Sequence, residues 1–131
     1  MFDPSAPILI VDDMGSMRKI VIKTCKELGF TQFTEAPDGA TGWETLCAAA
    51  PPIALVISAW HMPACSGLDL LKRVRSDSRF KSLPFFLITA ESEKTEIIEA
   101  AKLGMSGCIV KPFTSEALKN QLAEAYKRIY G

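Results

Sequence analysis

The sequence predicts an α/β domain in which a doubly wound, five-stranded parallel sheet is flanked by five helices. Short apolar or β-branched runs alternate five times with amphipathic stretches. The runs are almost continuously apolar, as is typical of parallel strands buried on both faces. No linker, repeat or low-complexity segment interrupts the 131 residues, 48% of which are hydrophobic, so one domain over residues 1–131 is expected, with no output domain after it.

The first two strand and helix pairs occupy the N-terminal half. Ile8–Val11 is apolar throughout and predicts a buried strand, followed by a helix over Met14–Leu28, where apolar residues recur at helical spacing until Gly29 ends it. A weaker strand over Gln32–Ala36 runs into a Pro-Asp-Gly turn. The helix expected after this turn covers Ala40–Ala50, with Trp43, Leu46 and Cys47 on one side.

Three further pairs follow the same pattern. A third strand is expected over Ile53–Ser58, with a helix over Leu68–Arg75, and a fourth strand over Pro84–Thr89, with a helix over Glu93–Leu103. The fifth pair is Gly107–Val110 and Ser115–Ile129. Parallel strands need crossover connections, and each amphipathic stretch supplies one, so the helices should cover both faces of the sheet.

Composition narrows the class of partner. Lys and Arg number 15 and so do Asp and Glu, which leaves no basic excess for nucleic acid or an anionic membrane. There is no signal-peptide pattern and no apolar window long enough to span a bilayer, so a cytoplasmic protein whose partners are proteins is expected. The four cysteines lack metal-ligand spacing, and Cys25 and Cys47 fall at apolar helical positions, which predicts reduced thiols.

Chemically active residues follow the expected strands at their carboxyl ends, where open parallel sheets form their functional crevice. Asp12 and Asp13 follow the first strand, Thr89 ends the fourth and Lys111 follows the fifth. Adjacent carboxylates favour a hard cation such as Mg²⁺, while a lysine and a hydroxyl can meet the oxygens of an anion. This set indicates a phosphoryl site, but Ala59 follows the third strand where a nucleophile is expected.

The stretches ILIVDDMGSMRKIV, EAPDG, VISAWHMP, LITAESEK and IVKPFT resemble the receiver domain of two-component response regulators, and in particular its stand-alone chemotaxis type. The resemblance extends over nearly the whole chain. It implies a flavodoxin-like, CheY-like fold with Mg²⁺ held by Asp12, Asp13 and the backbone carbonyl of His61. It also implies phosphoryl-stabilising roles for Thr89 and Lys111, and a cis Lys111-Pro112 bond.

Ala59 occupies the position at which the resemblance implies a phospho-accepting aspartate. A methyl group cannot form an acyl phosphate, so the chain is expected to be phosphorylation-incompetent and its Mg²⁺ affinity to be weakened. It is either a natural pseudo-receiver, acting as a phosphorylation-independent interaction module, or a phosphorylation-null mutant of an ordinary receiver. The retained Asp12, Asp13, Thr89 and Lys111 favour the second reading, because this metal and phosphate set has little purpose without an acceptor.

Ordinary structural roles compete with these readings. Asp13 could cap the following helix, and Thr89 or Lys111 alone would be unremarkable. His61 is expected to be a loop side chain rather than a phosphohistidine, and strand alternation should turn Ser58 away from the side of Ala59. Cys108 stands where the resemblance implies a switching aromatic residue, which puts the coupling from Thr89 to that position in doubt.

The leading function is therefore a non-enzymatic, monomeric signalling switch. The resemblance implies a histidine kinase of the chemotaxis type and a protein target such as a flagellar-switch protein, which reads the face that includes Ile97, provided that this side chain is exposed, and Cys108. A flavin or nucleotide carrier is disfavoured by the carboxylates in VDDMGSM, where such carriers need amide-rich loops. An aspartyl phosphatase using Asp12 is disfavoured because its second acid would fall at Met14.

Overall fold

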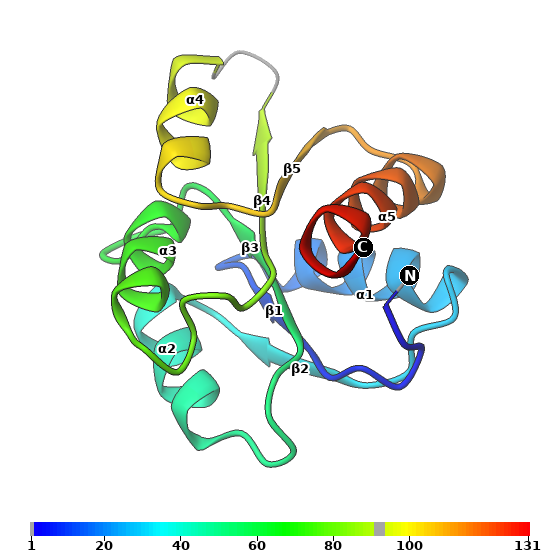
Figure 1. The fold of residues 1–131 in the computed structure, drawn as a ribbon, viewed down its shortest axis with the longest axis horizontal. Helices are drawn as coiled ribbons and strands as arrows, with labels where there is room; N and C mark the ends of the chain where they lie inside the picture. Colours follow the sequence, from blue (N-terminus) through cyan, green and yellow to red (C-terminus); the bar gives the residue numbers. More distant parts are fainter. Residues whose placement is uncertain (1, 91–93) are drawn as a thin grey trace.

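The strands form one parallel sheet whose order places the first strand near the middle. A computed structural model describes residues 2–90 and 94–131, and Figure 1 shows the five strands surrounded by helices. The spatial order is β2-β1-β3-β4-β5, which reverses direction at β1 and so confirms the doubly wound arrangement. The strands are β1 (Ile8–Val11), β2 (Phe33–Ala36), β3 (Leu55–Ala59), β4 (Phe85–Ala90) and β5 (Gly107–Lys111).

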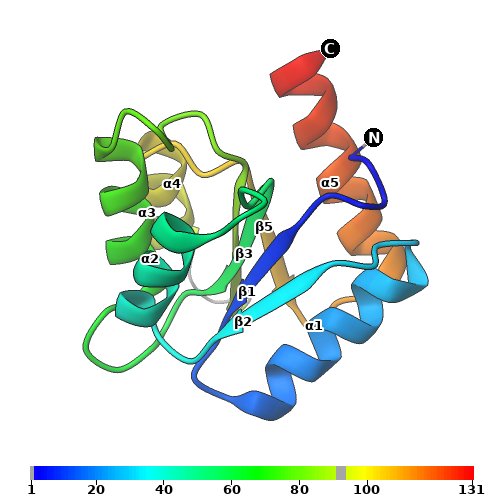
Figure 2. The ribbon, with the colours of Figure 1, turned by 90° about the horizontal axis from the view of Figure 1, so that it is seen from below.

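Helices cover both faces of this sheet. Figure 2 shows α1 and α5 on one side and α2, α3 and α4 on the other. Among the described residues, no helix combines the length and apolar content needed to cross a bilayer. The helices are α1 (Gly15–Glu27), α2 (Gly39–Ala48), α3 (Gly67–Ser76), α4 (Lys94–Lys102) and α5 (Ser115–Tyr130).

Strand alternation divides the interior into two apolar layers. In β1, Ile8 and Ile10 pack toward α1 and α5, whereas Leu9 and Val11 pack toward α2 and α3. All four side chains are almost fully buried. This explains the continuous apolar run in the sequence, because both faces of the strand lie against helices.

The expected elements are all present within the described residues, with small shifts at their ends. β1 has the expected bounds, but β3 and β5 extend far enough to include Ala59 and Lys111, which had been expected to follow their strands. Glu93, the expected start of the fourth helix, lies outside the described residues. The Lys111–Pro112 bond is cis, as the resemblance implied, and so is Ala50–Pro51.

One expected helix face is wrong. Cys47 had been placed with Leu46 on the buried side of its helix, but α2 buries Leu46 with two glycines, and Cys47 is exposed. Successive helical residues lie about 100° apart, so the residue after a buried one can turn to solvent. Within the described part of the chain no disulfide forms, and Cys25 is the buried thiol.

Candidate functional site

The two adjacent acids at the end of β1 have different environments. Asp12 is 3% exposed, whereas Asp13 is exposed. One carboxylate oxygen of Asp12, Oδ1, accepts a hydrogen bond from the backbone N–H of Met14 at 2.9 Å. The other, Oδ2, is buried and has no hydrogen-bond partner among the described residues. A buried, unsatisfied carboxylate oxygen is costly, and a bound cation would satisfy it.

Asp13 is not the cap of α1. The N-cap position is Met14, which makes no side-chain capping bond, and the helix begins at Gly15. Three other helices do have side-chain caps, from Asp38, Ser66 and Thr114. The expectation that Asp13 could cap this helix is therefore wrong.

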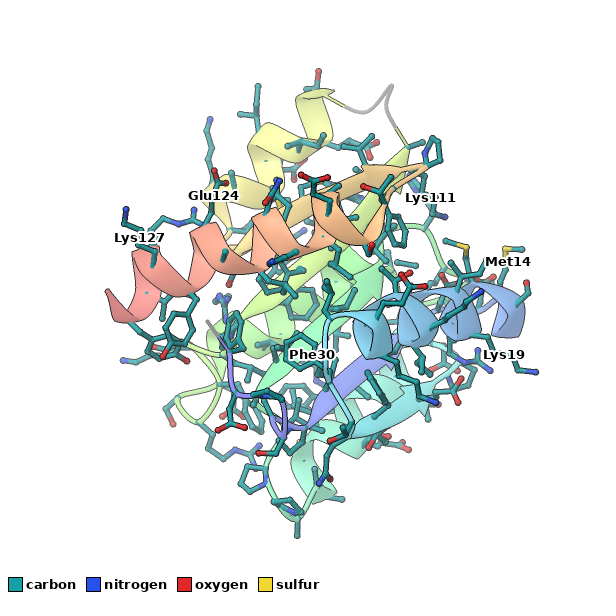
Figure 3. All side chains as sticks on the ribbon, turned by 90° about the vertical axis from the view of Figure 1, so that its right-hand side faces the viewer. Met14, Lys19, Phe30, Lys111, Glu124 and Lys127 are labelled. Carbon is teal, nitrogen blue, oxygen red and sulfur yellow. The ribbon has the colours of Figure 1, made fainter. Side chains whose placement is uncertain are left out.

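Burial raises the pKa of Asp12, and desolvation is the main cause because it disfavours the charged form. The hydrogen bond from Met14 and the positive charge of Lys111 act in the opposite direction. Lys111 is thus near enough for its charge to act on Asp12, although it is the last residue of β5 and 99 positions distant in sequence. Figure 3 shows Lys111 and Met14 toward the same end of the molecule.

Ala59 is the last residue of β3, which lies next to β1 in the sheet. It is 4% exposed and pairs in register with Ile88 of β4. The preceding Ser58 is fully buried, and its hydroxyl donates to the carbonyl oxygen of Ala59 at 2.9 Å. Because Ser58 pairs with Val11 in β1, the end of β3 lies directly beside Asp12 in the sheet.

Thr89 is the residue before the last in β4, and Lys111 is the last residue of β5. Thr89 is 2% exposed and pairs with Val110, and the following Ala90 pairs with Lys111. The Thr89 hydroxyl donates to the carbonyl oxygen of Ala90 at 3.4 Å, a long hydrogen bond. The sheet order thus brings the ends of β1, β3, β4 and β5 into one row, which the sequence could only suggest.

The loop after β3 provides a buried aromatic residue and an exposed imidazole. Trp60 is almost fully buried and packs in the layer with α2 and α3. The side chain of His61 is 64% exposed, and its Nε2 lies 3.7 Å from Oε2 of Glu96 on α4. This contact joins the loop to α4 and leaves the backbone of His61 next to the end of β3.

Arg18 is a site residue that sequence reasoning missed. Its Nη1 donates to the backbone carbonyl of Asp12 at 2.6 Å, and its Nε forms an ion pair with Glu35 at 2.9 Å. Arg18 therefore connects the end of β1 to β2. The only signal in the sequence was a basic residue one turn into the helix after the acid pair, and its partner could not be identified without the fold.

No set of three or more His, Cys, Asp or Glu side chains is arranged as a metal site in residues 2–90 and 94–131. The potential ligands at the strand ends are the two acids and backbone carbonyls. The observation that fits a cation here is the unsatisfied Oδ2 of Asp12, together with the desolvation that raises the pKa of the same carboxyl group.

The predicted output residues lie on α4 and β5. Ile97 is half-buried against the layer formed with α2 and α3, whereas its neighbour Ile98 is 59% exposed. Ile98 is therefore the exposed large apolar residue among the described side chains of α4, and Ile97 does not meet the condition of exposure. Cys108 is half-buried and lines a cavity of about 330 Å³ between β5 and α5.

The family model for the response regulator receiver domain matches residues 8–123. The chain is 42% identical over 124 residues to a chemotaxis protein CheY of Pseudomonas aeruginosa, covering 95% of this chain and 98% of that protein. It is 48% identical over 115 residues to a chemotaxis protein CheY1 of Helicobacter pylori, covering 88% of this chain and 92% of that protein.

Solved structures show the same fold. The chemotaxis response regulator CheY4 of Vibrio cholerae superposes with a TM-score of 0.81 at 30% identity, covering 92% of this chain and 98% of that one. A response regulator receiver domain protein of Clostridium thermocellum gives 0.83 at 23% identity, covering 94% and 95% of the two chains, and this likeness shows the fold alone.

Proposed function

Because the chain belongs to the response regulator receiver domain family, we propose that it is a stand-alone chemotaxis receiver in a phosphorylation-incompetent form, with Ala59 at the acceptor position. The observation that carries the proposal is the row of strand ends. Asp12, Ala59, Thr89 and Lys111 lie at the carboxyl ends of four strands that are neighbours in the sheet, and one buried oxygen of the Asp12 carboxylate has no hydrogen-bond partner among the described residues.

Asp12, Asp13 and the backbone carbonyl of His61 are the groups that would hold Mg²⁺. When bound, the ion supplies positive charge close to the oxygens of a phosphoryl group. The Thr89 hydroxyl donates a hydrogen bond to one such oxygen, and the Lys111 ammonium neutralises another. The half-buried position of Lys111 strengthens this attraction, since charge interactions increase as water is excluded.

With Ala59 at the acceptor position, this arrangement of metal ligands, hydroxyl and ammonium has no nucleophile. Transfer requires a carboxylate oxygen that attacks phosphorus while the donor oxygen leaves, and a methyl group has no lone pair. Ser58 is a poor substitute, because its hydroxyl is already bonded to the Ala59 carbonyl and successive strand residues point to opposite faces. The Ala59 protein is therefore expected to remain in the unphosphorylated state.

We further propose a cytoplasmic monomer that works without catalysing a reaction on a free substrate. Its partners would be a chemotaxis histidine kinase and a protein target of the flagellar-switch type, and not nucleic acid. The target would contact α4 through exposed Ile98 and β5 at Cys108. With a thiol in place of an aromatic ring, the side chain of Cys108 has less surface to move between buried and exposed positions.

Intact-mass measurement after incubation with acetyl phosphate and Mg²⁺ tests the proposal. The Ala59 protein should gain no mass, and Ala59→Asp should gain one phosphoryl group, while Ala59→Asn, which has similar shape but no nucleophilic carboxylate, should gain none. Stable labelling of the Ala59 protein, or failure of folded Ala59→Asp to be labelled, would contradict it.

Target binding separates a phosphorylation-null form from a natural module that needs no phosphorylation. Binding of the flagellar-switch-type target should be weak for the Ala59 protein and stronger for Ala59→Asp treated with beryllofluoride, a phosphoryl mimic. Equal, tight binding by the untreated Ala59 protein would assign it to the phosphorylation-independent class.

A further inference from the structure

The edge of the sheet at β2 exposes backbone groups that could pair with another strand. β2 is the outermost strand and pairs with β1. The carbonyl oxygens of Gln32 and Ala36 accept hydrogen bonds from the backbone N–H groups of Ile8 and Asp12, at 3.0 and 3.1 Å. Because peptide groups alternate in direction along a strand, those of residues 33 and 35 point away from β1, toward the open edge.

A basic groove lies on the α1 side of this edge. Its volume is about 550 Å³, and it is lined by the lysines Lys19, Lys23 and Lys26 together with apolar Ile22 and Phe33. The lysines follow one another at four and three residues, so they lie on one face of α1. Within the described part of the chain, no carboxylate comes within ion-pair distance of these lysines.

Glu35, the acid among the described lining residues, does not neutralise the lysine charges of the groove. Its carboxylate forms the 2.9 Å ion pair with Arg18. Within residues 2–90 and 94–131, the three lysines therefore line the groove without forming an ion pair to a carboxylate. A ligand that carries carboxylates matches this charge distribution.

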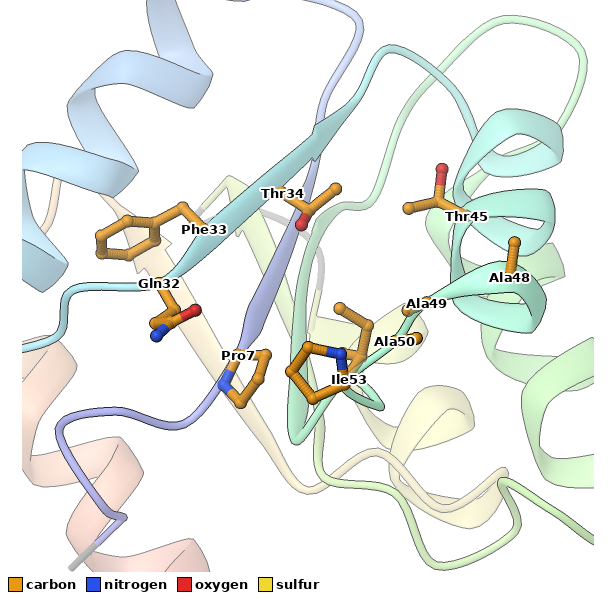
Figure 4. Close-up of a pocket in the computed structure, with 10 residues that line it drawn as sticks. Pro7, Gln32, Phe33, Thr34, Thr45, Ala48, Ala49, Ala50 and Ile53 are labelled. Atoms are coloured by element: carbon orange, nitrogen blue, oxygen red, sulfur yellow. The ribbon is translucent and has the colours of Figure 1, made fainter.

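An uncharged groove lies on the α2 side of the same edge. Figure 4 shows Phe33 and Thr34 of β2 and the end of α2 around it. Its volume is about 530 Å³, and its lining includes Ala48, Ala49 and Ile53 and no charged side chain. Small apolar side chains fit this lining, whereas charged ones would lose hydration without gaining a partner.

We propose that the open edge of β2 binds an extended acidic segment of another protein, which adds to the sheet as a sixth strand. Side chains of an added strand alternate between the two faces. The segment would direct its acidic residues to Lys19, Lys23 and Lys26, and its small apolar residues to the groove beside Ala48. This surface lies outside the row of strand ends around Ala59, to which the Arg18–Glu35 ion pair links it, and its residues take no part in phosphoryl transfer.

A second copy of the chain is a poor occupant, because pairing two β2 edges would bring two sets of these lysines together. Lysines on an edge strand itself often serve to prevent unwanted pairing. Here they belong to α1, and β2 offers outward peptide groups flanked by Thr34 and Glu35. The position of the lysines is suited to attracting a charged strand rather than to covering the edge.

Fluorescence anisotropy with a labelled ten-residue peptide that alternates glutamate and valine tests the charge component. The peptide should bind the protein, and added salt should weaken it. Lys23→Glu should reduce the affinity for the peptide by about tenfold, equivalent to roughly 1.4 kcal/mol. Lys119→Glu, at an exposed position of α5, should leave this affinity unchanged. A peptide that alternates lysine and valine should not bind. Absence of binding, or equal loss in the two variants, would overturn the proposal.

A pair of substitutions at one position tests the backbone component. Glu35→Ala removes the carboxylate but keeps the outward N–H, whereas Glu35→Pro removes both and leaves the bonds to β1 intact, because these involve residues 32, 34 and 36. The proline variant should bind the peptide more weakly than the alanine variant, with matching circular dichroism. Equal affinities would overturn strand addition, as would a dimer detected by sedimentation that Glu35→Pro abolishes, which would assign the edge to a second copy.

Discussion

Gly67, the first residue of α3, lies directly against the backbone of Ala59 at the end of β3. A β-carbon at Gly67 would overlap the carbonyl oxygen of Ala59 and would lie 2.8 Å from Cδ2 of Leu87. The N–H of Gly67 also donates to the carbonyl oxygen of Trp60 at 2.8 Å. The start of α3 therefore fixes the position of the strand end that carries Ala59.

Gly67→Ala should destabilise the protein by about 1–3 kcal/mol, because the added methyl group meets backbone rather than a flexible side chain. Urea unfolding followed by circular dichroism measures the change in the free energy of unfolding. Gly15→Ala is the matched control, since a β-carbon there would meet the end of the Arg18 side chain at 3.3 Å. Its effect should be within about 1 kcal/mol. Equal effects of the two substitutions would show that α3 can move away from Ala59.

Ala59→Asp should lower stability in the absence of metal. The new carboxylate would lie near buried Asp12, and like charges in a desolvated site repel each other. In chelator the free energy of unfolding should fall by about 1.4 kcal/mol for each unit by which repulsion raises the pKa of the pair. Thermal unfolding in EDTA at pH 7 measures it, with Ala59→Asn as the uncharged control. A variant as stable as the Ala59 protein would show that these carboxylates are not crowded.

Added Mg²⁺ should narrow or reverse the difference in the free energy of unfolding between the Ala59 and Ala59→Asp proteins. Ala59→Asp would provide a third carboxylate for the ion, so its Mg²⁺ affinity should exceed that of the Ala59 protein by about 1–2 kcal/mol. Fluorescence of Trp60, which is buried beside the site, provides the titration signal. Asp12→Asn should abolish tight binding in both backgrounds. Equal Mg²⁺ midpoints for the Ala59 and Ala59→Asp proteins would contradict a metal site at this strand end.

Asp77, after α3, should contribute to stability at neutral pH. Hydrogen bonds from the Arg79 side chain and then from its backbone N–H lower the pKa of Asp77 from 3.8 to about 2. A folded-state pKa below the unfolded value means that the stabilisation is present above pH 4 and is lost as pH falls toward 2. Asp77→Asn should therefore lower the melting temperature at pH 7 and not at pH 2.

A double-mutant cycle with Arg79→Gln isolates this pair. In the Arg79→Gln background, Asp77→Asn should have a smaller effect at pH 7, because the guanidinium that interacts with the carboxylate is gone. If the effect of Asp77→Asn were the same in both backgrounds, or did not change with pH, the pKa shift would have another origin.

Cys25 and Cys47 should differ strongly in reactivity toward a thiol reagent. Burial raises the pKa of Cys25 to about 12, so almost no thiolate forms at pH 8, whereas Cys47 is exposed beside Arg79. Peptide mapping after iodoacetamide treatment should find modified Cys47 in the folded protein and modified Cys25 only in denaturant. In a time course of iodoacetamide labelling, Cys47→Ser should remove the fast modification that Cys47 accounts for. Rapid modification of Cys25 under native conditions would indicate local opening of α1.

Much of the site could be predicted from the sequence because it depends on the ends of strands. β1 buries both faces, so its four residues are all apolar, and the first polar residue, Asp12, marks its end. The same reasoning placed Thr89 and Lys111 near strand ends, and the alternation of strands and helices predicted that these ends share one edge. The metal role of the acids and the acceptor role of position 59 remain predictions.

Adjacent residues were distinguished only by the tertiary structure. Asp12 and Asp13 have the same side chain, but one is buried and the other exposed. Ile97 is half-buried whereas Ile98 is exposed, and Cys47 is exposed beside buried Leu46. Sequence periodicity identifies an apolar face to within about one residue, whereas the packed neighbour decides which side chain on the border is covered.

Hydrophobic period and residue type are local properties, so they were enough to predict the class of fold and to select candidate residues at the strand ends. The strand order β2-β1-β3-β4-β5, the ion pair between Arg18 and Glu35 and the two grooves beside the open edge of β2 became visible only in the folded structure. These features depend on contacts between segments far apart in the chain. Such contacts form where packing leaves space or brings charges together, which no local pattern specifies.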